Sequence, residues 1–339
     1  MSPVLDRFAA FIGRASGMHG AIICLHGLDT GTRRSSSSMH ITLAHLSAIV
    51  EHVRRAGRLV SLKTLVEQHL SGQATNGLVA LTADDSYASW LEAEPLIRRV
   101  EIPLTMFPVS DALTTGQRFW WDRIDDAAAA ADTARWRQLE DECGLPAEYR
   151  RNDVQRPSSR PLRQWLLAVN AGRMPEAVEQ ALSRVESDLE IVSTQRSMTA
   201  SEFSGFLERT EATVGVHTAS HAALPFLSDK QVVREVHEGH TALKARFPRV
   251  LPYLAIPFGL FDERTSRLAA EAGMSASFTL EAQPLRVPTA STVGIPRVCV
   301  VREQGVGMLM LRTSRAGALI ERARSGPPRT YPILPGSAS

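Results

Sequence analysis

Two adjacent carboxylates and two histidines spaced four residues apart have the residue types and spacing needed for chemistry. The stretch LTADDSYAS places Asp84 and Asp85 directly after an apolar, strand-like run. The stretch VGVHTASHAAL places His217 and His221 directly after another such run. In folds built on parallel strands, ligands and catalytic groups gather at the carboxyl ends of the strands. Both pairs fall where such a fold would use them.

The two histidines and one carboxylate have the composition of a catalytic metal site. A spacing of four residues places His217 and His221 on the same side of a helical turn, where they can share one cation. Two His and one Asp suit catalytic Zn²⁺ and related metals and leave positions open for water and substrate. The second carboxylate could serve as a general base. Each motif alone also fits a simpler interpretation: a helix-capping Asp-Asp-Ser turn, and two unrelated surface histidines.

Strand-like and helix-periodic segments alternate along most of the chain, which predicts an α/β fold with a mainly parallel sheet or barrel. We expect about seven strands from eight candidate segments, at 20–26, 59–62, 77–82, 102–107, 213–216, 251–256, 276–279 and 297–301. Helices are expected at 42–56, 199–209, 229–247 and 263–272. Thr199 and Glu202 form a capping-box pattern, and Gly273 is typical of a helix end.

The segment from about 125 to 197 lacks strand character and predicts a helical insertion, broken at the stretch RPSSRP (156–161). The aromatic run Phe119, Trp120, Trp121 precedes it. This run fits a platform for stacking sugars or a hydrophobic anchor for the inserted helices, which we favour. We therefore expect an N-terminal extension at 1–18, one barrel domain at 19–325 that contains the insertion, and a Pro-rich tail at 326–339.

The composition is that of a globular protein with a large core: 339 residues, 44% hydrophobic and 22% charged. A net charge of +2 without a long basic run argues against a nucleic-acid partner. Cys24, Cys143 and Cys299 are too scattered for a disulfide framework or a zinc ribbon, so we interpret them as buried thiols. No segment has the roughly 18 apolar residues of a membrane span. The N-terminus lacks the pattern of a signal peptide, and a cytoplasmic location is expected.

The sequence resembles the polysaccharide deacetylases of carbohydrate esterase family 4, which share the NodB homology domain. The stretch TADDS at 82–86 is similar to the family's first motif, TFDDG. The stretch HTASHA at 217–222 is similar to the second, HTxxHP, and LAIPFG at 254–259 to the third, FAYPYG. The order of the motifs matches as well, so the resemblance spans about 20 to 301 apart from the helical insertion.

The resemblance implies a metal-dependent hydrolase that removes an N-acetyl group from a saccharide or glycan precursor. Asp85, His217 and His221 would bind a divalent metal, Zn²⁺ in the first place, with Co²⁺ and Ni²⁺ as alternatives. Asp84 would be the general base. The substrate would be an N-acetylated saccharide, and the sequence leaves the oligomeric state open.

The resemblance also bears on the substrate groove and on the general acid. The turn of Pro257, Phe258 and Gly259 would line the groove and present a backbone N–H to the oxyanion. Many members supply the acid from a late Leu-x-His motif, yet no His follows His240 in this chain. Some branches use a His at the end of the first strand, which makes His26 the candidate, with a structural His at a strand end as the alternative.

Three positions depart from the family's motifs. Ser86 replaces a Gly, Ala222 replaces a Pro, and Ala255 stands where an Arg anchors the base in many relatives. Without that Arg, the motifs leave the orientation and pKa of Asp84 open. Two other functions therefore stay open: an amidohydrolase acting on a cyclic amide or ureide, and a catalytically impaired homologue that binds saccharide.

Overall fold

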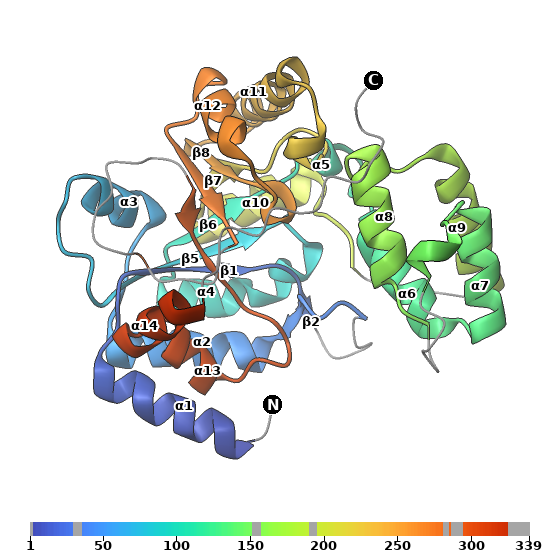
Figure 1. The fold of residues 1–339 in the computed structure, drawn as a ribbon. Coiled ribbons are helices and arrows are strands. Elements are labelled where there is room, and N and C mark those ends of the chain that lie inside the picture. The colour runs from blue at the N-terminus through green and yellow to red at the C-terminus, as the bar shows by residue number, and fades with distance from the viewer. Residues whose placement is uncertain are drawn as a thin grey trace.

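Parallel strands lie at the centre of the molecule, with helices around them (Figure 1). The computed structural model describes residues 3–29, 36–150, 157–189, 195–280, 285 and 294–324. The sheet contains β1 (Ala21–Leu25), β4 (Arg58–Leu59), β5 (Leu78–Asp84), β6 (Leu104–Phe107), β7 (Thr213–Val216), β8 (Val250–Ala255), β9 (Ala276–Thr279), β10 (Ile295–Pro296) and β11 (Val298–Cys299). Their order is β10-β9-β8-β7-β6-β5-β1-β11, and β4 pairs with the start of β5.

The last strand segment closes this sheet into a barrel. β10 pairs with β9 and β11 pairs with β1, and in the chain only Arg297 separates β10 from β11. The segment 295–299 is therefore one strand, interrupted at Arg297, that joins the two edges of the sheet. Counted as one strand, it reduces the eight strands of the path to seven. The prediction of a distorted (β/α) barrel with about seven strands is confirmed.

Four helices around the barrel begin and end close to the predicted residues: α2 (Leu43–Ala56), α10 (Ala200–Thr210), α11 (Asp229–Arg246) and α12 (Glu263–Glu271). A fifth, α4 (Glu94–Val100), was not predicted. The capping box of Thr199 and Glu202 at the start of α10 is confirmed. The strand expected at 59–62 ends early, at Leu59. The reason is that Ser61 accepts a hydrogen bond from the Thr64 N–H and starts α3 (Leu62–Leu70).

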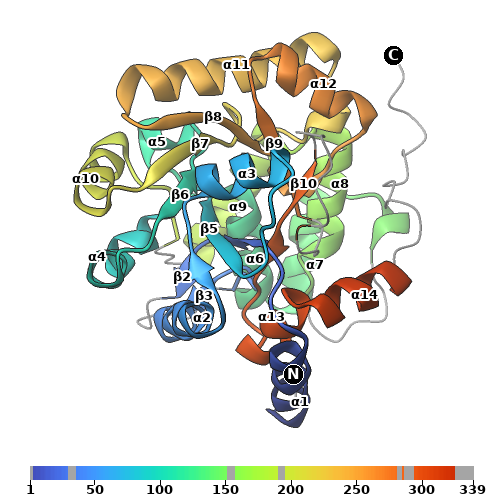
Figure 2. The same ribbon diagram turned by 90° about the vertical axis from the view of Figure 1, so that its left-hand side faces the viewer.

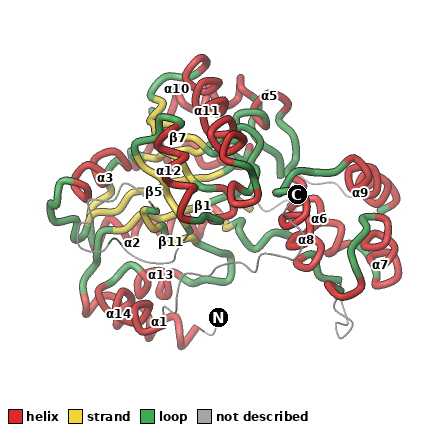
Figure 3. Tube along the Cα trace, turned by 45° about the horizontal axis from the view of Figure 1, so that its top comes forward, coloured by secondary structure: helices red, strands yellow, loops and turns green. Residues whose placement is uncertain are grey.

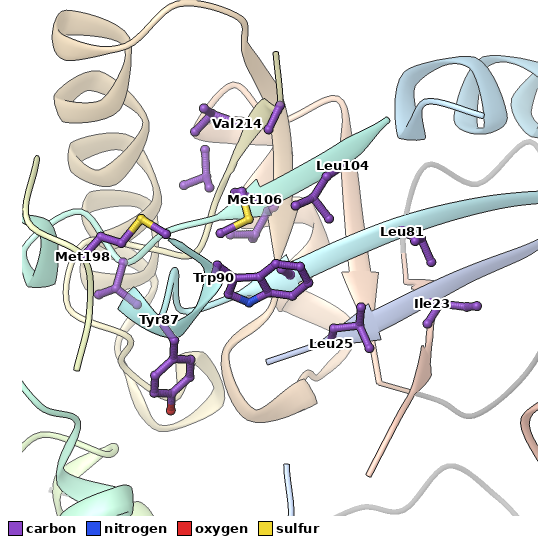
Figure 4. Close-up of a cluster of buried hydrophobic side chains, with 14 of the residues drawn as sticks. Ile23, Leu25, Leu81, Tyr87, Trp90, Leu104, Met106, Met198 and Val214 are labelled. Carbon is purple, nitrogen blue, oxygen red and sulfur yellow. The ribbon is translucent and has the colours of Figure 1, made fainter. Parts of the chain in front are cut away.

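Alternate residues of each strand face two different cores. One set lies in a buried cluster together with side chains of the surrounding helices. Figure 4 shows Ile23, Leu25, Leu81, Leu104 and Met106 of this cluster. The other set packs inside the barrel and includes Ile22, Ala80, Phe107, Ala255 and Phe278. Because both faces are buried, the strands appear in the sequence as continuous apolar runs.

Helix α3 closes one end of the barrel. Its side chains Leu62, Leu65 and Val66 belong to the same buried cluster as the interior residues Ile22 and Phe278. Figure 2 shows α3 in front of the strands, at the end where β4 pairs with the start of β5. The amino ends of the strands are thus covered, and the carboxyl ends remain for a functional site.

The predicted helical insertion forms a separate group of helices beside the barrel (Figure 1 and Figure 3). It contains α6 (Trp120–Ala130), α7 (Thr133–Glu142), α8 (Arg160–Asn170) and α9 (Glu176–Asp188), and it has a hydrophobic core of its own. It begins at Trp120, earlier than the predicted 125, because Trp121 and Asp122 are buried in the first turn of α6. Of the predicted break at 156–161, residue 156 lies outside the described residues, and α8 begins at Arg160.

The two ends of the described chain pack together. Helix α1 (Pro3–Ser16) lies against α13 (Val306–Arg312), and the Asp6 carboxylate accepts hydrogen bonds from the N–H groups of Gly307 and Met308. Helix α14 (Arg315–Arg324) follows, and the predicted tail at 326–339 lies outside the described residues. None of the described helices combines the length and the apolar character needed to cross a bilayer.

Candidate active site

The acidic pair lies at the carboxyl end of β5. Asp84 is the last residue of the strand, and the Asp85 N–H donates to the Phe107 carbonyl at 3.0 Å. Asp85 and Ser86 have left-handed backbone angles, with φ of 67° and 52°. Ser86 therefore holds the conformation that Gly would adopt most easily, and we take this as backbone strain stored at the site. Asp84 and Asp85 are buried, at 1% and 2% exposure.

The two histidines lie in the loop after β7. The sequence predicted a helical turn here, and this prediction is wrong: residues 217–221 form a compact loop. Thr218 and His221 have φ of 61° and 62°, which a right-handed helix does not allow. The Thr218 hydroxyl accepts a hydrogen bond from the His221 N–H at 3.0 Å and tightens the loop. The spacing of four residues still brings both imidazoles together.

Three ligand atoms converge on one point. His217 Nε2 and His221 Nε2 are 3.1 Å apart, and Asp85 Oδ1 lies 3.5 Å and 3.4 Å from them, respectively. Ligands placed about 2.0–2.2 Å from a tetrahedral zinc ion are roughly 3.4 Å apart. The spacing of these atoms is therefore that of three ligands of one cation.

The protonation of these groups also suits a cation. The Ala255 carbonyl lies 2.8 Å from His217 Nδ1, so Nδ1 carries the proton and Nε2 keeps its lone pair. Burial lowers the pKa of His217 to about 4, and the pKa of His221 well below its ordinary value. Burial raises the pKa of Asp85 to about 7, and among the described residues Asp85 Oδ1 has no hydrogen-bond partner. A buried, unpaired carboxylate oxygen facing two neutral imidazoles fits a divalent metal.

Arg297 holds the second carboxylate of the pair. Its guanidinium donates hydrogen bonds to both oxygens of Asp84, each at 2.7 Å, and is fully buried. Burial by itself would raise the pKa of Asp84, but the charge of Arg297 outweighs it and keeps this pKa below its ordinary value. Arg297 was not among the residues predicted from the sequence, although a lone Arg inside the apolar stretch PRVCV was a usable signal.

His26 follows β1 at the same end of the barrel. Its carbonyl accepts a hydrogen bond from Trp90 Nε1 at 2.6 Å, and its Nδ1 lies 3.9 Å from Cys299 Sγ. Burial would lower the pKa of His26, but Cys299 and the carboxylates of Asp84 and Asp85 raise it to about 9. A histidine that keeps its proton at neutral pH can act as an acid, and this role of His26 stays a prediction.

Glu235 of α11 supports the histidine loop from behind. Its carboxylate accepts hydrogen bonds from the Ser220 N–H at 3.0 Å and from the Ser220 hydroxyl at 2.8 Å. Its other close contact comes from the insertion, where Arg173 donates to it at 3.0 Å. Glu235 is itself buried, so the loop between the two histidines has a rigid, charged support.

Aromatic side chains form a wall beside His221. The ring centroids of Trp121 and Phe258 each lie 4.4 Å from the imidazole centroid. Phe119 stacks on Trp121 at 4.6 Å, and Phe119 and Trp121 are buried. This burial agrees with the interpretation of the aromatic run as an anchor. The run also reaches the site through Trp121, whose ring centroid lies 5.5 Å from that of Phe258.

The turn at 257–259 is present as a short 3-10 helix at the end of β8. Phe258 has a left-handed φ of 58°, and the N–H of Gly259 donates to the Ile256 carbonyl at 3.0 Å. The N–H of Leu260 donates to the Pro257 carbonyl in the same way, at 3.1 Å. The N–H groups of Gly259 and Leu260 are thus paired within the turn, and a backbone donor from this turn stays a prediction. The Phe258 ring lies beside His221.

Comparison with known proteins agrees with this site. Residues 193–277 match the family model described as polysaccharide deacetylase, and the match includes both histidines, β7 and β8. No curated protein matches the sequence significantly.

Several solved structures share the fold. One is IcaB from Ammonifex degensii, at 16% identity and a TM-score of 0.56, covering 88% of this chain and 98% of that one. Another is the Streptococcus pyogenes deacetylase PplD in complex with acetate, at 10% identity, a TM-score of 0.52, and 88% and 99% coverage. A third is a de-N-acetylase from Aggregatibacter actinomycetemcomitans, at 11% identity and a TM-score of 0.53. The match covers 86% of this chain and 98% of that one. Over residues 193–277 this chain is therefore similar to the polysaccharide deacetylases, and it shares the fold of these solved structures.

Proposed function

We propose that this protein is a metal-dependent deacetylase that hydrolyses the N-acetyl amide of an acetylated saccharide. The observation that carries the proposal is the convergence of Asp85, His217 and His221 on one point, next to an Asp84 carboxylate held by Arg297. Polysaccharide deacetylase is the family that the sequence of the histidine segment matches. Among structures with this fold, one is a de-N-acetylase and another is a deacetylase in complex with acetate.

Asp85, His217 and His221 would hold the metal, and Zn²⁺ is the ion that best suits two imidazoles and one carboxylate. A divalent cation there supplies Lewis-acid polarisation of a carbonyl and acidification of water. Burial keeps the imidazole of His217 neutral and ready to bind it. Burial disfavours the Asp85 carboxylate, so a bound cation would stabilise the charge that burial makes costly.

Asp84 accepts the proton of the attacking water. Its Oδ2 lies 4.0 Å from His217 Nε2, so the carboxylate reaches the space in front of the metal ligands. Arg297 occupies one side of both oxygens, which keeps Asp84 ionised and fixes the direction of its remaining lone pairs. Water then adds to the acetamide carbon as its proton passes to Asp84.

His26 donates a proton to the departing amine. The C–N bond breaks as the amine nitrogen takes this proton, and the products are acetate and a free amino sugar. The raised pKa of His26, about 9, means that the imidazole is protonated at neutral pH and available for this step. The Phe258 ring and the Trp121 ring would border the bound sugar and exclude water from one side.

The experiment combines metal content with product analysis. The purified protein is expected to bind one zinc ion at these residues and to release acetate from N-acetylglucosamine oligomers. Asp85→Ala and His217→Ala should lose both properties, whereas His237→Ala, an exposed histidine on α11, should keep both. Acetate release that is undiminished in Asp85→Ala would overturn the proposal, and so would ring opening of a cyclic ureide without any acetate release. A cytoplasmic location stays a prediction from the sequence.

A further inference from the structure

Two cysteines that are far apart in the sequence lie side by side next to Asp84. Cys24 of β1 and Cys299 of β11 are direct partners in the parallel register. Successive side chains of a strand point to opposite faces. Cys24 and His26 are two residues apart and therefore point to the same face. That face is the barrel interior, because Cys24 Sγ donates to Asp84 Oδ2 at 3.4 Å. Cys24, His26 and Cys299 therefore meet at the carboxyl end of the barrel.

The three donor atoms have the spacing of a metal site. Two sulfurs and one imidazole nitrogen all lie within 4.8 Å of one another, and Cys299 Sγ lies 3.9 Å from His26 Nδ1. A thiolate and an imidazole bound to one tetrahedral zinc ion are roughly 3.6 Å apart. A shift of a few tenths of an ångström is therefore enough to bring this sulfur and this nitrogen onto one ion.

A disulfide between the two cysteines fits the same geometry less well. Neighbouring strands are about 4.8 Å apart, and partners in parallel register send their side chains the same way. The two Cβ atoms are thus separated by roughly the strand spacing, whereas a disulfide needs about 3.5–4.5 Å between them. An ion that bridges the sulfurs suits this spacing better than a direct S–S bond.

We propose that Cys24, His26 and Cys299 form a second cation site, selective for a thiophilic divalent ion of the kind represented by Zn²⁺ and Cd²⁺. Thiolate ligands select such soft ions over Mg²⁺ and Ca²⁺. Binding releases the proton of Cys24 and the proton shared by Cys299 and His26, and the two thiolate charges balance the charge of the ion. The adjacent Arg297 and Asp84 neutralise each other through their own ion pair. His26 and Cys299 are half-buried, so solvent can supply a fourth ligand.

This site is separate from the Asp85 site, and Asp84 contacts both. Asp84 Oδ2 lies 3.4 Å from Cys24 Sγ and 4.0 Å from His217 Nε2. An ion bound by Cys24, His26 and Cys299 occupies a nitrogen lone pair of His26. His26 can then no longer take up the proton that it donates to the departing amine. Occupation of the site therefore inhibits hydrolysis. This consequence rests on the proposed function, whereas the existence of the site does not.

The test uses the full chain with one equivalent of zinc already bound, titrated with Co²⁺. Thiolate ligands give cobalt an intense near-ultraviolet charge-transfer absorption that a site of imidazoles and carboxylate lacks. We expect this absorption to saturate at one equivalent of Co²⁺, and to disappear in Cys24→Ala/Cys299→Ala and in Cys299→Ala alone. Cys143→Ala is the matched control, because Cys143 is buried in the core of the helical insertion, and it should keep the absorption.

A second measurement does not depend on variants. Cd²⁺ should protect Cys299 of the wild-type protein from alkylation by iodoacetamide, as read by mass spectrometry of the peptide that contains it. Absence of both the charge-transfer absorption and the protection would overturn the site, whatever the protein hydrolyses. Excess zinc should also reduce acetate release by the wild type at least tenfold. A thiolate absorption without any loss of hydrolysis would keep the site and overturn its inhibitory effect.

Discussion

Arg297 donates two hydrogen bonds to Asp84, from a position 213 residues further along the chain. Both residues are buried inside the barrel, and Arg297 lies between the two strand segments that close it. The same residue thus lies at the closure of the fold and holds the proposed general base. Arg297 thus provides an anchor for Asp84 in a chain that has Ala255 where the resemblance implied an Arg.

Arg297→Lys should lower the rate of acetate release about 100-fold, because a single ammonium group cannot hold both carboxylate oxygens in one orientation. Zinc content should stay at its wild-type level, since Asp85, His217 and His221 are untouched. Arg163→Lys is the matched control: Arg163 also donates to both oxygens of one carboxylate, that of Asp125, but in the helical insertion. Full activity in Arg297→Lys would show that Asp84 needs no such anchor.

Glu235→Gln should weaken zinc binding about 10- to 100-fold, because Glu235 orients the loop that carries His217 and His221 without contacting the metal. Competition with a chromophoric chelator measures this affinity directly. Glu238→Gln, on the exposed face of the same helix, should leave the affinity unchanged. Equal zinc affinities in the wild type and in Glu235→Gln would contradict a supporting role for this carboxylate.

Gly215→Ala should destabilise the fold by about 1–3 kcal/mol, because an added methyl overpacks the interior of the barrel. A Cβ at Gly215 would lie 2.2 Å from the Phe107 ring, which is buried among other barrel residues and cannot move aside. Gly205→Ala provides the contrast. Its Cβ would meet only the end of the Arg209 side chain, and alanine favours the helix by up to about 1 kcal/mol. Thermal unfolding of the two variants should shift in opposite directions.

The stability of the protein should depend on pH through Asp122. Burial raises its pKa from 3.8 to about 8, and Asp125 and Asp85 add to this shift, although the hydrogen bond from Tyr87 opposes it. The folded state therefore binds a proton that the unfolded state releases above about pH 4. The contribution of Asp122 to stability is complete below that pH and is lost as the pH rises towards 8, by up to about 1.4 kcal/mol per pH unit.

Asp122→Asn should flatten this dependence, since the amide carries no titrating proton and still accepts the Tyr87 hydrogen bond. Denaturant unfolding of both proteins between pH 5 and about 8 measures the difference in slope. Asp188→Asn, at an exposed position on α9, should leave the slope as in the wild type. Parallel curves for the wild type and Asp122→Asn would mean that Asp122 does not carry the proton.

Local signals in the sequence were reliable where they act over a few residues. Thr199 and Glu202 cap α10 as predicted, because a capping box is complete within one helical turn. The loop of His217 and His221 was placed correctly after its strand but predicted in the wrong conformation. Its left-handed residues are held by Thr218 and by Glu235 of another helix, and spacing alone does not report such contacts.

By itself, the sequence determined the barrel and the three side chains proposed to bind the metal. The alternation of apolar segments specifies parallel strands, and the adjacency of Asp84 and Asp85 and the four-residue spacing of the histidines are local patterns. Only the tertiary structure decided how Asp84 is held and which side chains face it. Arg297, Cys24 and Cys299 come from the first and last strands of the barrel and become neighbours through its closure. Contacts of this kind depend on strand register and on the inward or outward direction of each side chain, which are properties of the assembled sheet.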